Sequence, residues 1–190
     1  MSAFEHVTAL FSFVYALALT HLLARIAELI VARERVRFSG LLAVGMANAV
    51  VLVFANWLSL WDLRSIKTWD LGSIVIQFLF AVIIFIVCAL VGPKVPDEGP
   101  IDLEDFFWRQ RPYLYGAIVA GVLLSLIANL AYLKTATPLL FLKQNLFNLP
   151  MFIPTVSALL FRNRWLQWFG GLGFLAMMVG YTIAFCSTLG

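Results

Sequence analysis

The sequence predicts an all-α integral membrane protein in which residues 1–190 form a single helical bundle. The first observation is composition, because 63% of the residues are hydrophobic, only 12% are charged, and the mean hydropathy is +0.96. Water-soluble domains are about half apolar and about a quarter charged. The second observation is that the apolar runs reach the roughly 20 residues that a membrane-spanning helix needs. These runs lack the alternation of apolar and polar residues typical of barrel strands.

Six apolar runs predict six transmembrane helices, at residues 4–24, 38–60, 71–92, 113–133, 138–161 and 165–189. The first run contains small residues that resemble a signal-peptidase site. However, Glu5 precedes it and no Lys or Arg does, so the positively charged start of a signal peptide is missing. We therefore interpret the first run as a helix of the mature protein.

The distribution of basic residues predicts the orientation of the bundle. Eight of them fall in the loops after the first, third and fifth helices: Arg33, Arg35, Arg37, Lys94, Arg109, Arg111, Arg162 and Arg164. On the opposite side stand only Arg64, Lys67 and Lys134. Cytoplasmic loops of membrane proteins are enriched in Lys and Arg, so both termini are predicted to lie outside the cytoplasm. The same single, scattered basic residues argue against a nucleic-acid partner.

The longest loop, between the third and fourth spans, predicts a short interfacial helix at about residues 102–111. Asp102 is placed to cap it, and Pro112 is expected to end it. Its apolar face would consist of Leu103, Phe106, Phe107 and Trp108. The acidic 97–105 segment also admits an enzymatic interpretation, as a metal or diphosphate site, although its spacing matches no known ligand pattern. The acids of that segment are Asp97, Glu98, Asp102, Glu104 and Asp105.

The first span carries ionisable residues at helical spacing. His21, Arg25 and Glu28 fall on one face, and of these only His21 is expected at full membrane depth. The simplest interpretation is an interfacial ion pair on an overlong helix. A role for His21 in handling protons or ions, and ligation of a haem by His21 or His6, are the alternatives.

The fifth span is unusually polar and contains two prolines in its interior. The polar-site candidates are Gln144, Asn145, Asn148, Pro150 and Pro154, and Lys143 stands beside them. Prolines free backbone carbonyls, and interrupted helices with clustered amides form solute sites in transporters. The alternative is that the span begins near Asn145 and that Lys143 reaches to the outer interface.

The fourth span has small and polar residues at every fourth position. These are Ala117, Gly121, Ser125 and Asn129. Small residues at this spacing allow close helix packing, and Ser and Asn can hydrogen-bond across the contact. The pattern predicts a packing face, either within one chain or between chains.

Residues 14–20 (VYALALT) and 56–58 (NWL) resemble the first and second helices of the small six-helix potassium-leak channels of the lysosomal type. That resemblance implies a pore lined by the first helix. The family's arginine-led Phe-Ser-Asp motif is broken here, because His6 stands near the arginine position and Phe13 replaces the aspartate. The predicted outside N-terminus also opposes the family's inside one, so no pore residues are carried over.

Three function classes follow from these features. The favoured one is an oligomeric channel or carrier for a small ion or polar solute. The second is a non-catalytic accessory or scaffold subunit of a membrane complex, and the third is a membrane enzyme that uses the acidic loop. No catalytic motif, metal site or cofactor site is expected. The predicted partners are the lipid bilayer and either further copies of the chain or a larger membrane complex.

Overall fold

The computed structural model describes residues 3–65, 69–132, 139, 141–142, 145–146 and 148–186, and it is all-α apart from one short strand pair. Its helices are α1 (Ala3–Val31), α2 (Gly40–Ser59), α3 (Leu71–Val91), α4 (Leu103–Tyr132), α6 (Asn148–Leu160) and α7 (Arg164–Cys186). Two 3-10 helices, η1 (Arg33–Arg35) and η2 (Leu60–Ser65), and two strands, β1 (Val36–Arg37) and β2 (Ile101–Asp102), connect them.

Five of these helices, α1, α2, α3, α4 and α7, are long and apolar enough to cross a membrane. They confirm the prediction of a multi-pass helical membrane protein. The remaining helix, α6, has 13 residues, which at 1.5 Å per residue cover only about 20 Å. A hydrocarbon core is about 30 Å thick, so α6 alone is too short to span it.

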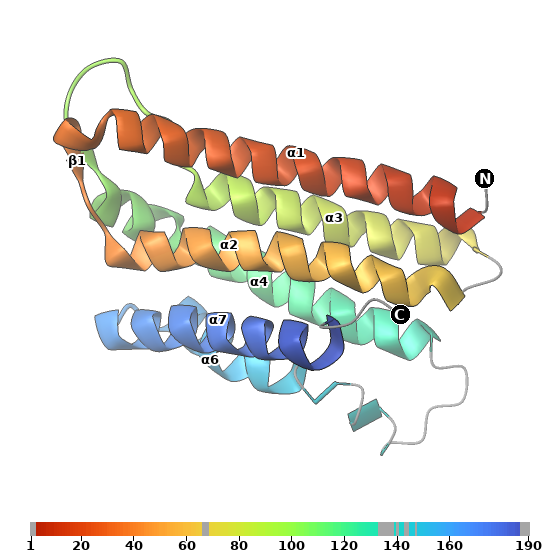
Figure 1. The fold of residues 1–190 in the computed structure, drawn as a ribbon. Helices are drawn as coiled ribbons and strands as arrows, with labels where there is room; N and C mark the ends of the chain where they lie inside the picture. The colour runs from red at the N-terminus through yellow and green to blue at the C-terminus, as the bar shows by residue number, and fades with distance from the viewer. Residues whose placement is uncertain are drawn as a thin grey trace.

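The helices lie side by side along one direction (Figure 1), and their contacts close into a ring. Each helix packs on the next in the order α1, α3, α4, α6, α7 and α2, and α2 packs on α1 again. Helix α2 also contacts α3 and α4 across the ring. A Cβ atom at Gly45 of α2 would lie 3.5 Å from Val91 Cγ1 and 3.8 Å from Leu114 Cδ2. The interior at that level is therefore occupied by side chains.

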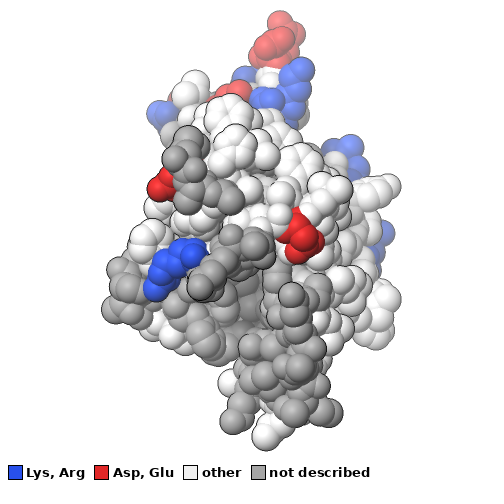
Figure 2. All heavy atoms as spheres, turned by 90° about the vertical axis from the view of Figure 1, so that its right-hand side faces the viewer, with Lys and Arg blue, Asp and Glu red and all other residues white. Residues whose placement is uncertain are grey.

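The loops predicted to be rich in Lys and Arg gather at one end of the bundle. Strands β1 and β2 pair in parallel there, with Arg37 opposite Asp102, and Figure 1 places β1 at the end away from the start of α1. Arg35, in the loop after α1, donates to the carbonyl oxygen of Asp97 (3.0 Å), in the loop after α3. The Arg162 guanidinium, in the loop after α6, lies 5.7 Å from the ring centroid of Trp108. The loop after α6 is therefore at the same end. At the opposite end, the described charged side chains are few and separated (Figure 2).

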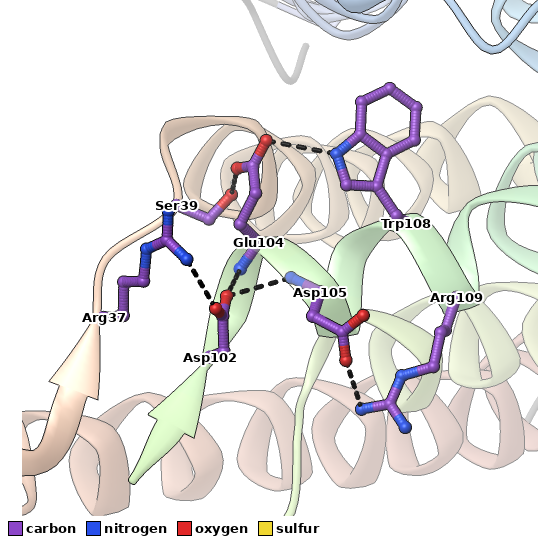
Figure 3. Close-up of polar contacts among 7 residues, drawn as sticks. All are labelled: Arg37, Ser39, Asp102, Glu104, Asp105, Trp108 and Arg109. Carbon is purple, nitrogen blue, oxygen red and sulfur yellow. Dashed lines mark hydrogen bonds and ion pairs between the residues drawn. The ribbon is translucent and has the colours of Figure 1, made fainter.

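Side-chain caps explain where several helices begin. Ser39 accepts from the N–H of Leu42 (3.4 Å) at the start of α2, and Asp70 accepts from the N–H of Ser73 (3.0 Å) at the start of α3. Asp102 accepts from the N–H groups of Glu104 and Asp105, both at 3.0 Å (Figure 3). Such bonds satisfy N–H groups that have no partner within the helix. The Asp105 N–H, with the Arg37 guanidinium beside it, lowers the pKa of Asp102.

The expected break at Pro112 is wrong, because α4 runs continuously from Leu103 to Tyr132 with Pro112 inside it. A proline removes one helical hydrogen bond and bends the helix, but it does not end a helix that is held on both sides. Leu103 and Phe107 are buried in the core, and Phe106 and Trp108 pack against it. The apolar face that predicted an interfacial helix therefore faces the bundle, as the first turns of α4.

Candidate functional site

A turn in the polar fifth segment forms the centre of the candidate site. Asn145 and Leu146 lie in a turn, and α6 begins at Asn148. The backbone N–H of Asn145 donates to the Phe141 carbonyl (3.0 Å), and its own carbonyl accepts from the Leu149 N–H (3.0 Å). The side chain of Asn145 is 0% exposed. An amide is therefore fully enclosed by protein just before α6.

Hydrogen bonds join this amide to α4. Asn145 Oδ1 accepts from Asn129 Nδ2 (2.7 Å) and from Asn148 Nδ2 (3.1 Å). Asn148 Nδ2 also donates to Ser125 Oγ (2.9 Å), and Asn145 Nδ2 donates to the Phe141 carbonyl (2.9 Å). We call Ser125, Asn129, Asn145 and Asn148 the amide cluster. It contains no charged side chain, and its members come from α4, the turn and the first residue of α6.

The sequence singled out both halves of the cluster, but as unrelated features. Ser125 and Asn129 belong to the small-residue face of α4, and the other half of that face lies against different neighbours. A Cβ atom at Gly121 would lie 3.4 Å from Ile83 Cγ2 of α3, and Ala117 packs against the core. Within the described residues, this face therefore makes contacts inside the chain.

Two of the cluster's oxygen atoms accept no hydrogen bond within the part of the chain that the structure describes. No hydrogen bond from another described residue reaches Oδ1 of Asn129 or Oδ1 of Asn148, and both residues are half-buried. Each amide nitrogen of the cluster donates to a protein oxygen, whereas these two side-chain oxygens can accept from a ligand. The arrangement suits a cation or a solute that carries O–H or N–H groups.

The other candidates of the fifth segment differ in their placement. Gln144 and Lys143 lie outside the described residues. Pro150 stands in the first turn of α6 (Asn148–Leu160), where a missing N–H costs little. Pro154 is inside α6 and buried. Because Pro154 has no N–H, the Pro150 carbonyl loses its helical donor.

His21 does not join the amide cluster. Its ring lies 6.0 Å from the ring of Phe85 on α3, and α1 packs on α3 and α2 whereas α6 packs on α4 and α7. One turn along α1, Arg25 Nη1 and Glu28 Oε2 form an ion pair at 2.7 Å. The simplest interpretation of this face, an ion pair on an overlong helix, matches these positions.

Three of the acidic loop residues, Asp102, Glu104 and Asp105, bond to neighbouring protein groups (Figure 3). Arg37 Nη1 lies 2.8 Å from Asp102 Oδ2, and Arg109 Nη2 lies 3.1 Å from Asp105 Oδ2. Glu104 accepts from Ser39 Oγ (2.7 Å) and from Trp108 Nε1 (3.1 Å). Within the described residues, no group of three or more His, Cys, Asp or Glu side chains could hold a metal ion.

Sequence reasoning missed a second polar group, at the end of α6. Gln167 Nε2 donates to the carbonyls of Ala158 (2.9 Å) and Phe161 (2.8 Å), and Arg111 Nη1 donates to the same two carbonyls at 2.7 and 2.9 Å. Both side chains satisfy carbonyls that have no helical donor. The sequence feature that could have identified this group is a single amide, Gln167, near the start of an apolar helix. Gln167 Oε1 is buried without a hydrogen-bond donor.

Helix α7 fits closely between α6 and α2. A Cβ atom at Gly170 would overlap Ala158 Cβ and lie 2.9 Å from the Pro154 carbonyl oxygen. At Gly171 a Cβ atom would lie 2.9 Å from Val44 Cγ1. Asn48 Nδ2 of α2 donates to the Gly171 carbonyl (2.8 Å). These contacts leave no gap between α7 and its neighbours α6 and α2 in the described part of the bundle. They lie on the side of the amide cluster that faces the charged end of the bundle.

Comparisons of the chain with protein-family models, with curated proteins and with solved structures gave no match. The amide cluster is therefore interpreted from its own residues.

Proposed function

We propose that this protein is a carrier for a small ion or polar solute and that the amide cluster is its binding site. The observation that carries the proposal is the fully buried Asn145 in a turn, bonded to Asn129 of α4. A polar side chain at membrane depth is costly against lipid, so an enclosed group of amides in an apolar segment is a candidate for a functional site.

The free oxygens of the cluster favour a cation or a hydroxylated solute. Oδ1 of Asn129 and Oδ1 of Asn148 accept no hydrogen bond from the described residues. An uncharged set of amide oxygens replaces part of a hydration shell without binding an ion irreversibly. The proposed substrate is therefore a monovalent cation, a proton carried with water, or a small polyol or amide.

Close packing on one side of the cluster favours a carrier over a permanently open pore. A Cβ atom at Gly170 would overlap Ala158 Cβ, and one at Gly171 would lie 2.9 Å from Val44 Cγ1. One at Gly45 would be in ordinary contact with Val91 and Leu114. A route from the cluster to the charged end would therefore require α6 and α7 to move relative to α2 and α4. Alternating access by such rocking is the usual mechanism of small helical transporters.

The proposed topology has six spans, with segment 138–161 as the fifth and both termini outside the cytoplasm. The charged end, where the three arginine-containing loops meet, would then face the cytoplasm. Single cysteines at Ser2 and at Gly99, in a Cys-free background, should react with an impermeant reagent from opposite sides of the membrane. Labelling from the same side would contradict the topology.

Flux through proteoliposomes tests the proposed function. Asn148→Leu and Asn129→Leu should each lower solute flux about tenfold, because each removes an oxygen that replaces water around the solute. Candidate solutes are K⁺, Na⁺, protons and small polyols. The matched control is Asn56→Leu, since Asn56 Nδ2 donates only to the Leu52 carbonyl of its own helix (2.8 Å).

The control variant should keep the wild-type flux. Equal flux in all four proteins would contradict the site, and no flux of any of these solutes in the wild type would contradict the function. The second candidate function, a non-catalytic subunit of a membrane complex, predicts that last result. It is favoured by one observation, that each amide nitrogen of the cluster donates to a protein oxygen.

A further inference from the structure

An apolar pocket lies between α1 and α2, away from the amide cluster. Its volume is about 350 Å³, which falls within the range of small-ligand sites. The lining residues used below are Ser12, Tyr15 and Ala16 from α1 and Val53, Phe54 and Trp57 from α2. None of them belongs to the amide cluster, so this inference is independent of the proposed function.

The lining contains one buried polar residue, Tyr15, which is 3% exposed. No hydrogen bond joins its hydroxyl to another described residue. A buried hydroxyl without a hydrogen bond is costly, and a ligand oxygen would remove that cost.

The remaining lining suits a flat ring. The rings of Phe54 and Trp57 are stacked, with centroids 6.5 Å apart and an interplanar angle of 30°. Both side chains are about half exposed, so a further planar group can extend the stack. An acyl chain would need neither the aromatic faces nor the hydroxyl.

We propose that the α1–α2 pocket binds a lipid-soluble ligand with a flat, carbonyl-bearing ring, of the quinone class. The Tyr15 hydroxyl donates to a ring carbonyl, the ring stacks beside Phe54 and Trp57, and the apolar tail leaves into the bilayer. Binding alone is proposed, with no electron transfer.

Tryptophan fluorescence tests this proposal, with decylubiquinone as the probe and the protein in phosphatidylcholine nanodiscs. Quinone dissolved in lipid quenches in proportion to its concentration, whereas a bound quinone adds a saturable component. Trp57→Phe should remove most of that component. Tyr15→Phe keeps the ring and should raise the dissociation constant about three- to tenfold, the value of one hydrogen bond.

Ala16→Leu should abolish saturable quenching by filling the pocket. Its matched control is Ala9→Leu, at an exposed position of the same helix outside the lining, which should leave quenching unchanged. Circular dichroism of each variant checks the fold. Saturable quenching that survives Ala16→Leu, or that is absent in the wild type, would overturn the proposal. Unchanged affinity in Tyr15→Phe would overturn carbonyl recognition by the hydroxyl.

Discussion

Replacing Gly170 by alanine is expected to destabilise the protein by about 2–3 kcal/mol. The new Cβ atom would overlap Ala158 Cβ and approach the Pro154 carbonyl oxygen to 2.9 Å. Both contacts belong to α6, and one is with backbone, so neither can be relieved by a side-chain rotation. Overpacking of this kind usually costs about 1–3 kcal/mol. The cost falls on the α6–α7 contact, which holds one wall of the bundle.

Gly116→Ala is the matched control for this prediction. A Cβ atom at Gly116 would meet no atom within 4 Å, and alanine favours a helix over glycine by about 1 kcal/mol. Thermal unfolding in one detergent, followed by circular dichroism, should show a lower midpoint for Gly170→Ala and an equal or higher midpoint for Gly116→Ala. Equal midpoints for the two variants would show that α6 and α7 are not packed this closely.

The second large effect is expected at Asn145. Asn145→Ala removes the oxygen that accepts from Asn129 and Asn148, and it leaves donors in an apolar setting. An unsatisfied buried donor costs about 1–3 kcal/mol, although hydrogen bonds between membrane helices usually contribute somewhat less. We therefore expect a loss of about 1–2 kcal/mol in the free energy of unfolding.

A double-mutant cycle identifies the cause of that loss. Combining Asn145→Ala with Asn129→Ala should cost clearly less than the sum of the two single changes, with a coupling of about 0.5–1.5 kcal/mol. Pairing Asn145→Ala with Asn56→Ala should give additive losses, because Asn56 bonds within its own helix. Additivity in both cycles would contradict the hydrogen bond between α4 and the turn.

Helix positions were predictable because hydropathy is a local property of the chain. The five spanning helices follow apolar runs that are visible in the sequence. The amides at Asn145 and Asn148 and the polar face at Ser125 and Asn129 were also identified, since polar residues in apolar segments are conspicuous. The sequence could not predict that these residues form one cluster, because the cluster depends on α4 and α6 being neighbours in the ring.

The same dependence on helix order explains the failures. His21, a candidate for handling protons or ions, lies on α1, which packs on α3 and α2, whereas α6 packs on α4 and α7. Pro112 was expected to end a helix, but the packing of Phe107 and Leu103 on the core holds the helix on both sides of it. Gln167 was overlooked because its importance comes from carbonyls at the end of another helix.

Aqueous access to the amide cluster tests the central claim most directly. Asn148→Cys, in a Cys-free background and reconstituted in liposomes, should react with a charged methanethiosulfonate reagent, because a solute site must be reached by water. Ile153→Cys is the matched control on the same helix, since Ile153 is exposed on the apolar surface and a charged reagent does not enter lipid. We expect reaction at position 148 and none at position 153. Equal protection of both cysteines would contradict it.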